Sequence, residues 1–478
     1  MIWLVTGYGL AADKKTNIDR FLNACYNRGL LNGVVLVVEN DSVIYKKAFG
    51  PADSAWDIAN RVDTKFYLYS MTQQFTAALI LKLAEEGKLK TDGVIRDYLP
   101  YYREDTGKKI TIHHLLTHTH GIPDVEYRQL PLVNPFPVKD FVSKFLSKDL
   151  EFAPGSRVKV SYITGYTLLG AIIEQVTGKK YEQVLKEKIL DPLKMKNSGF
   201  IPFDTVVKKL ATPYHETPND KKSIFFRFRC NGGSSMYASV DDLLLWHKAL
   251  NGTALLTDKS KESMFTGFVP AAGSGSYGYG WNIVNLTSEK VKKQVAWHVG
   301  EGSVAIWRII DDNHLIIILG NIVSPRIVEI CTSLSNLLYN RPGILPKRSF
   351  ISALNKIIAK KGVPAGVEEY KRLRKNFFNE YDFSESQLNT LGNYLISTNR
   401  LNEAVEIFKL NLDYFPDSWF IYTRLGETFI RGKQKEMAIK CYEAAVKLIP
   451  RGEEQAYKEI EAILQQIKAQ PKPKPTEL

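Results

Sequence analysis

Ser70 begins a stretch of helical periodicity, and Gln73 follows three residues later in the segment Ser-Met-Thr-Gln. A serine hydroxyl is a weak nucleophile unless a neighbouring group accepts its proton. Residues three apart share one face of a helix, and the helix dipole favours negative charge at its N-terminus. The spacing therefore suits a nucleophile and its base, but a carboxamide cannot take up a proton at ordinary pH. Ser70 is thus a candidate nucleophile without a base at this position or, alternatively, a helix-capping serine.

His298, in the segment Trp-His-Val-Gly-Glu-Gly, is a candidate substitute base for Ser70. Imidazole titrates in the range that general base catalysis requires. The alternative is a structural histidine on a strand. Tyr277, Tyr279 and Trp281 lie close together in the sequence, and we expect them to form the wall of a pocket.

One segment is rich in histidine, but its neighbourhood lacks the carboxylates and the HExxH spacing of a metal site. Its histidines are His113, His114, His118 and His120. We interpret them as loop and helix-start residues, and we predict neither a bound metal nor another cofactor.

The elements that must position these residues are both strands and helices. Residues 33–50 contain two β-rich runs around Asn-Asp-Ser, which is typical of a hairpin. Apolar residues recur with helical period over residues 70–87, and a second helix is expected after Ser239 as its N-cap. Three strands are expected in the segments KKQVAWHVG, SVAIWRII and HLIIILGN. This mixture favours an α/β (α+β) domain over an all-helical or all-β one.

After the Pro- and Gly-marked segment LYNRPGILPKRS, strand alternation stops and a repeat begins. Residues 385–418 and 419–452 superimpose with a period of 34. The matched pairs are Leu391 and Leu425, Gly392 and Gly426, Ala404 and Ala438, Phe408 and Tyr442, and Pro416 and Pro450. Small residues where paired helices touch, with a proline ending each unit, are typical of tetratricopeptide repeats.

These patterns predict five segments. They are a truncated export signal at 1–13, a first domain at 14–340, a linker and helix pair at 341–384, tetratricopeptide repeats with a capping helix at 385–468, and a disordered tail at 469–478.

Six segments of the first domain, in order, resemble the serine β-lactamase and penicillin-binding-protein superfamily, in its class C β-lactamase, D,D-peptidase and esterase branch. The segments are GVVLVVENDSVIYKKAFG, TKFYLYSMTQQFTAALILKLAEEGKL, ITIHHLLTHTHGIPD, FAPGSRVKVSYITGYTLLGAIIEQVTG, YGYGWNI and WHVGEG. The resemblance implies an antiparallel sheet flanked by helices, a helical subdomain, and a site between them. Activity does not follow from the fold and must be argued at the site.

The resemblance also implies roles for residues of the first and second motifs, and this chain departs from the family pattern in both motifs. In the family a lysine occupies the position of Gln73, and a Tyr-x-Asn motif supplies its partner. One register places that motif at Ser161 and Ile163, and a second at Val160 and Tyr162. A third register, with gaps on both sides, makes Tyr162 the tyrosine and Thr164 its polar partner.

The third motif of the family survives better. His298, Val299 and Gly300 match its His-x-Gly pattern. By resemblance, the backbone N–H of Glu301 would join that of Ser70 in an oxyanion hole. Such a hole needs no side chain, so it can persist after the base is lost.

Composition narrows the classes of partner. The formal charge of +13 comes from 64 Lys and Arg scattered among 51 Asp and Glu, so we expect a solvated basic surface and no nucleic-acid partner. No run approaches the roughly 18 to 20 apolar residues of a membrane span. The first residues, MIWLVTGYGLAAD, resemble the end of a secretory signal without its cationic start. We therefore expect a periplasmic or secreted protein, or a cytoplasmic one if this segment is not a signal.

The sequence leads to one main functional hypothesis and two alternatives. The main hypothesis is an impaired or inactive hydrolase site that binds a peptide, a peptidoglycan fragment or a protein partner. Its binding residues would include Gln73, Ser161, Tyr279, Gly300 and Glu301. One alternative is an active esterase, D-amino-acid peptidase or β-lactamase-like enzyme that uses Ser70 with Tyr162 or His298 on a small ester or amide. The other is an interaction scaffold in which the tetratricopeptide groove binds a protein.

Overall fold

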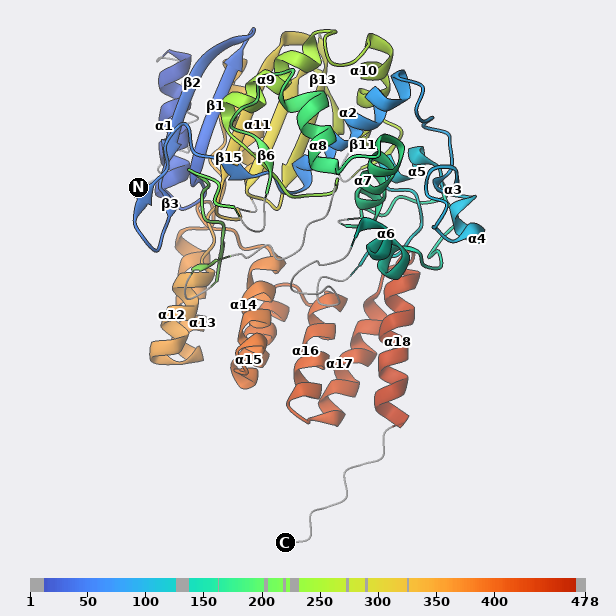
Figure 1. Cartoon of the computed structure of the whole chain (residues 1–478). Coiled ribbons are helices and arrows are strands. Elements are labelled where there is room, and N and C mark those ends of the chain that lie inside the picture. Colours follow the sequence, from blue (N-terminus) through green and yellow to red (C-terminus); the bar gives the residue numbers. More distant parts are fainter. Residues whose placement is uncertain are drawn as a thin grey trace. The chain divides into compact units, whose positions relative to one another are not determined.

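The computed structural model describes residues 13–125, 137–161, 163–201, 205–217, 221–223, 232–271, 275–288, 291–324 and 326–469 (Figure 1). By its internal contacts the chain divides into two units. The first comprises Met1–His215 and Ser223–Pro346, and the second comprises Glu216–Lys222 and Lys347–Leu478. The expected export signal and C-terminal tail, apart from their innermost residues, lie outside the described residues, as does Tyr162.

An eight-stranded sheet forms the centre of the first unit, and every neighbouring pair of its strands is antiparallel. Its strands, in spatial order, are β10 (Val269–Pro270), β11 (Ser276–Tyr277), β12 (Asn282–Ser288), β13 (Val291–Gly300), β14 (Val304–Ile309), β15 (His314–Gly320), β1 (Gly33–Glu39) and β2 (Ser42–Phe49). The three strands expected near the end of this unit are β13, β14 and β15. The hairpin expected at 33–50 is β1 and β2, and its turn residues Asn40 and Asp41 have the left-handed φ values of 48° and 61° that tight hairpins require.

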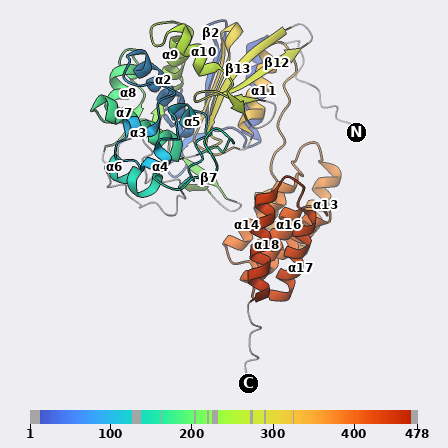
Figure 2. The same ribbon diagram turned by 90° about the vertical axis from the view of Figure 1, so that its right-hand side faces the viewer.

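Helices cover both faces of this sheet (Figure 2). Alternate residues of β1 point to opposite faces, so Val35 packs in one cluster with Phe21 of α1 (Lys14–Asn27) and Leu334 of α11 (Ile327–Leu338). Leu36 packs in the other cluster with Leu79 of α2 (Thr72–Glu85). Each such fully buried aliphatic side chain contributes about 1.5–3 kcal/mol to stability.

The remaining elements of this part of the chain are further helices and three small sheets that are separate from the central one. The helices are α3 (Ile95–Tyr98), α4 (Glu104–Gly107), α5 (Ile112–Leu116), α6 (Val138–Phe141), α7 (Thr164–Thr177), α8 (Tyr181–Leu185), α9 (Val240–Asn251) and α10 (Asp258–Phe265). The small sheets are β5 (Phe66–Tyr67), β9 (Met236–Ala238) and β6 (Gly199–Phe200); β3 (Pro51–Asp53) and β4 (Ile58–Ala59); and β7 (Tyr214–Glu216) and β8 (Lys221–Ser223). Ser239 caps α9 as predicted, since its side chain accepts from the Asp242 N–H.

The regular secondary structure described in the second unit is helical, apart from the residues that it contributes to β7 and β8. Its helices are α12 (Ile351–Lys361), α13 (Val363–Asn376), α14 (Glu385–Ser397), α15 (Leu401–Leu412), α16 (Trp419–Arg431), α17 (Lys435–Leu448) and α18 (Glu454–Ala469). A Cβ on Gly426 would lie 2.7 Å from the ring of Tyr442, and one on Gly392 would overlap the ring of Phe408. The 34-residue period therefore corresponds to the same close helix contact, made twice.

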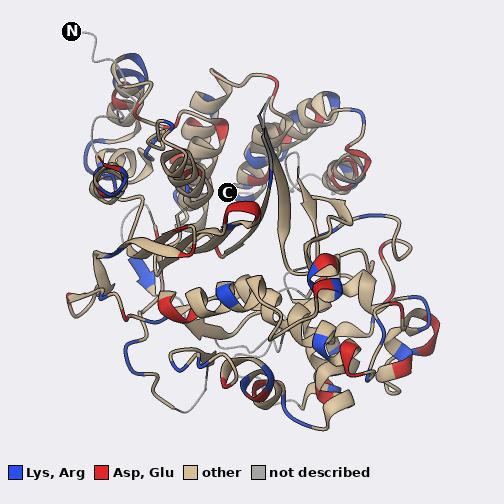
Figure 3. Ribbon diagram, turned by 90° about the horizontal axis from the view of Figure 1, so that it is seen from above, with Lys and Arg blue, Asp and Glu red and all other residues tan. Residues whose placement is uncertain are grey.

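Lys and Arg are interspersed with Asp and Glu over the ribbon seen in Figure 3. Among the described residues, no helix combines the length and hydrophobicity needed to span a bilayer.

Candidate functional site

Ser70 lies in a single 3-10 turn, η1 (Tyr69–Met71), directly before α2. No side chain caps this turn or the helix after it, so the alternative in which Ser70 is a capping residue does not hold. Tyr69 has a left-handed φ of 51°, which costs a non-glycine residue about 1–2 kcal/mol. Strain of this size persists only where the surroundings hold it, and it is found preferentially at functional sites.

The C-terminal end of β13 packs directly on the turn that carries Ser70. A Cβ on Gly300 would overlap the carbonyl oxygen of Leu68 and lie 3.1 Å from the Cβ of Tyr69. Only glycine therefore allows the strand to approach this closely. The Tyr69 hydroxyl also forms a hydrogen bond with Ser303, which ties the loop after β13 to the same turn.

Two backbone N–H groups at this junction are available to a ligand. Among the described residues, neither the Ser70 N–H nor the Glu301 N–H has a hydrogen-bond partner. Glu301 is exposed and has a left-handed φ of 46°. A pair of free donors at the start of a helix and the end of a strand has the character of an oxyanion hole.

Gln73 is only 3% exposed, and its amide is already engaged. The Tyr277 hydroxyl donates to Gln73 Oε1 across 3.1 Å, and it also interacts with the Tyr166 hydroxyl. Tyr166 in turn donates to the carbonyl of Leu116 across 3.0 Å. Burial raises the pKa of both phenols well above the ordinary value, so they stay protonated and act as hydrogen-bond donors.

His298 is held by the loop before β12. Its Nδ1 lies 2.7 Å from the carbonyl of Gly280, and because a carbonyl can only accept, Nδ1 carries the proton. Burial lowers the pKa of His298 to about 4. Gly280 has a left-handed φ of 78°, and a Cβ there would lie 2.9 Å from the carbonyl of Gln73. The imidazole is thus anchored to a loop that touches the start of α2.

The second motif is organised by an aspartate that sequence reasoning missed. Asp124 Oδ1 accepts from the Ser161 hydroxyl at 3.1 Å and from the N–H groups of Ile163 and Thr164 at 3.1 and 2.9 Å. A carboxylate that follows Gly-Ile-Pro in a loop carries no sequence signal for capping a helix 40 residues later. The Ser161 N–H donates to His118 Nδ1 across 3.3 Å.

His118 and His113 connect the histidine-rich segment to the tyrosines. The ring of His118 lies 5.0 Å from that of Tyr277, and His113 Nδ1 is 2.8 Å from the Tyr279 hydroxyl. Burial lowers the pKa of His118 to about 3 and that of His113 below its ordinary value. No group of His, Cys, Asp and Glu among the described residues has the geometry of a metal site.

Comparison with known proteins places this arrangement in a family. Residues 16–331 match the family model described as beta-lactamase. The chain belongs to the beta-lactamase family. Residues 421–451 match the model of a tetratricopeptide repeat, so this beta-lactamase-family chain also carries a helical repeat region.

Two named proteins and one solved structure illustrate the range of relatives of this beta-lactamase-family chain. It is 31% identical to the protein PbpX of Bacillus subtilis over 54% of this chain and 68% of that protein. It is 27% identical to esterase EstB of Burkholderia gladioli over 58% of this chain and 80% of the esterase. Its fold matches that of the octameric penicillin-binding protein homologue from Pyrococcus abyssi with a TM-score of 0.61 and 25% identity, over 72% of this chain and 81% of that one.

Proposed function

We propose that the beta-lactamase-family unit keeps a hydrolase-shaped pocket with impaired or absent turnover, and that this pocket binds a peptide, a peptidoglycan fragment or a protein partner. The observation that carries the proposal is the hydrogen bond from Tyr277 to Gln73. It engages an amide at the position where a base would have to accept the Ser70 proton. An amide held in this way can orient a ligand but cannot relay a proton.

The titratable groups near Ser70 support the same conclusion. A general base works best when its pKa lies near the working pH. The pKa of His298 is lowered to about 4, and the pKa of Tyr277 is raised by burial, so one is a weak base and the other a weak acid at neutral pH. Loss of a positioned base typically costs about 10² to 10⁴ in rate, or roughly 3–5 kcal/mol of transition-state stabilisation.

The free N–H pair of Ser70 and Glu301 favours a second candidate function, an active serine hydrolase acting on a small ester or amide. In that case Ser70 would pass its proton to Tyr162 or to His298. The name of the relative EstB, an esterase, is compatible with this function. In serine hydrolases whose catalytic side chains have been removed, the oxyanion hole and substrate binding still accelerate the reaction roughly 10³- to 10⁴-fold over water.

Labelling with a fluorescent penicillin and a fluorophosphonate, together with ester turnover, separates the two functions. We expect weak labelling and no ordinary turnover in the wild type. Labelling that is stoichiometric, accompanied by turnover and abolished in Ser70→Ala would establish the enzyme. Tyr162→Phe and His298→Gln would then identify the proton acceptor, since only the variant lacking it should lose activity.

The repeat region supplies a second binding surface in this proposal. Stacked helical repeats form extended concave surfaces that bind other proteins. We infer that residues 385–468 bind a protein partner, that 341–384 joins them to the domain at 14–340, and that residues 1–13 direct export to the periplasm or beyond. Deleting 385–468 should abolish capture of that partner and leave ligand binding to the first unit unchanged. If the deletion abolished both partner capture and ligand binding to the first unit, the assignment of these functions to separate regions would be wrong.

A further inference from the structure

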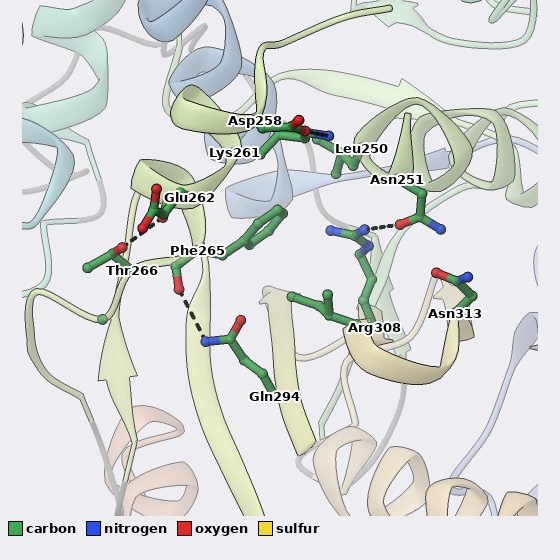
Figure 4. Close-up of a pocket in the computed structure, with 12 residues that line it drawn as sticks. Leu250, Asn251, Asp258, Lys261, Glu262, Phe265, Thr266, Gln294, Arg308 and Asn313 are labelled. Carbon is green, nitrogen blue, oxygen red and sulfur yellow. Dashed lines mark hydrogen bonds and ion pairs between the residues drawn. The ribbon is translucent and has the colours of Figure 1, made fainter. Parts of the chain in front are cut away.

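A cavity of about 430 Å³ is lined by residues of α9, α10, β13 and β14 (Figure 4). Its wall includes Gln294 of β13, which precedes His298 by four residues. The residues that line the cavity include none of the candidate residues of the hydrolase site, so it is a separate cavity.

Arg308 of β14 forms the deep end of this cavity, and its side chain is almost fully buried, at 1% exposure. Its Nε donates to His247 Nδ1 across 3.1 Å, and its Nη2 donates to Asn251 Oδ1 across 2.6 Å. Its Nη1 is buried and has no hydrogen-bond partner among the described residues. No carboxylate of the described chain forms an ion pair with it.

The Arg308 guanidinium is charged, and no carboxylate of the described residues neutralises it. Burial lowers the pKa of Arg308 to about 9 and that of His247 to about 3, so at neutral pH the arginine is a cation beside a neutral imidazole. The rings of Phe265 and Trp281 lie 5.0 and 5.7 Å from it, which gives partial cation–π stabilisation. A buried charge is ordinarily paired, and the missing partner here is an anion.

We propose that this cavity binds a small molecule with a single carboxylate, which Arg308 holds through Nη1. The planar guanidinium matches a carboxylate in geometry. The side chain of Phe265 is only half-buried and lies beside the guanidinium (Figure 4). Leu250 and the Phe265 ring offer apolar walls for the rest of the molecule.

The charges around the cavity favour one negative charge over two. Lys261 is neutralised by its ion pair with Asp258 at 2.8 Å. Glu262 is exposed at the rim and forms no ion pair within the described part of the chain. A monoanion would neutralise the free cation inside the cavity, whereas a dianion such as phosphate would leave a second buried negative charge without a partner.

Benzoate is a suitable probe, and the full chain is the material to use. Calorimetric titration and thermal unfolding should show benzoate binding with a rise in Tm, whereas the neutral isostere benzamide and inorganic phosphate should have no effect. Arg308→Met should lower benzoate affinity by about tenfold or more, as expected for a lost charged hydrogen bond. This variant should fold, because methionine is similar in size to the apolar stem of arginine and leaves no buried charge without a counterion.

Three further variants keep the test decisive. Thr266→Trp, at an exposed rim position, should block benzoate without disturbing the fold. Glu262→Gln should leave affinity unchanged or strengthen it by up to about threefold, through loss of a like charge. Ser70→Ala should not alter it. Absence of benzoate binding at about 10 mM, equal binding of phosphate or benzamide, unchanged affinity in Arg308→Met, or lost affinity in Ser70→Ala would each overturn the proposal.

Discussion

Replacing Gln73 by lysine tests directly whether proton transfer is what the site lacks. The new amine would stand where the carboxamide now accepts from Tyr277. Because this position is buried, desolvation should lower the pKa of the lysine, so that a useful fraction is neutral and able to accept the Ser70 proton. The Tyr277 hydroxyl can donate to that neutral amine, which preserves its hydrogen bond.

The size of the gain follows from the surroundings. A positioned general base is typically worth about 10² to 10⁴ in rate. Burial raises the pKa of Tyr277 and lowers that of His298, so neither can share the proton efficiently, and we expect the lower end of this range. The predicted increase in kcat/KM is therefore about 10²-fold, or roughly 3 kcal/mol. Burial of the amine should destabilise the fold by about 1–3 kcal/mol.

Hydrolysis of p-nitrophenyl acetate provides the assay, with Gln73→Met as the matched control of similar length and no base. Only Gln73→Lys should gain activity, and the gain should disappear when Ser70→Ala is added. A folded Gln73→Lys protein with unchanged turnover would refute the reasoning, because it would show that the pocket has a defect other than the missing base. Equal activity of the wild type through Ser70 would refute it as well.

Two further predictions concern stability. Gly426→Ala should lower the free energy of unfolding of the repeat region by about 1–2 kcal/mol, because its Cβ would meet the Tyr442 ring at 2.7 Å. In the control Gly432→Ala, the new Cβ has no neighbour within 3.4 Å, so this variant should be neutral or stabilising by about 0.4–1 kcal/mol. Urea unfolding followed by circular dichroism measures both variants. Equal stabilities of the two would contradict the prediction. Burial lowers the pKa of His298 from 6.5 to about 4, so the unfolded chain binds the proton first and stability falls as pH drops through this window. His298 should account for about 1.6 kcal/mol of the loss between pH 6.5 and 5, so His298→Gln should reduce the pH dependence of the free energy of unfolding by about this amount. An unchanged pH dependence in this variant would contradict the reasoning.

Local patterns in the sequence were sufficient for much of the fold. Strands β13, β14 and β15 and helix α2 follow from side-chain periodicity, because each element buries one or both faces at a characteristic spacing. The repeat follows from equal residues at equal positions, and the contacts of Gly392 with Phe408 and of Gly426 with Tyr442 are the physical content of that period.

The chemistry at Ser70 was predictable only in part. The presence of Gln73 in place of the family's lysine is visible in the sequence, and so is the His-x-Gly motif that ends at Gly300. The partner of Gln73 is not, because Tyr277 lies 204 residues away and a tyrosine near a glycine-rich turn carries no signal of what it will contact. The role of Asp124 was hidden for the same reason.

The sequence by itself determined the first hairpin, the helix after Ser70, the last three strands of the sheet, that two helical repeats follow a mixed domain, and that the residue three after Ser70 cannot accept a proton. Only the tertiary structure decided which side chains share a sheet face. In the sequence, Arg308 is a single charged residue within an apolar strand. A shift of one residue in the strand register would turn its side chain to the opposite face of the sheet. Its pairing opposite Ala296 sets its register, and its burial beside Phe265 and Trp281 leaves a cation without a counterion. Such contacts depend on where distant segments meet, and local side-chain preferences do not encode that.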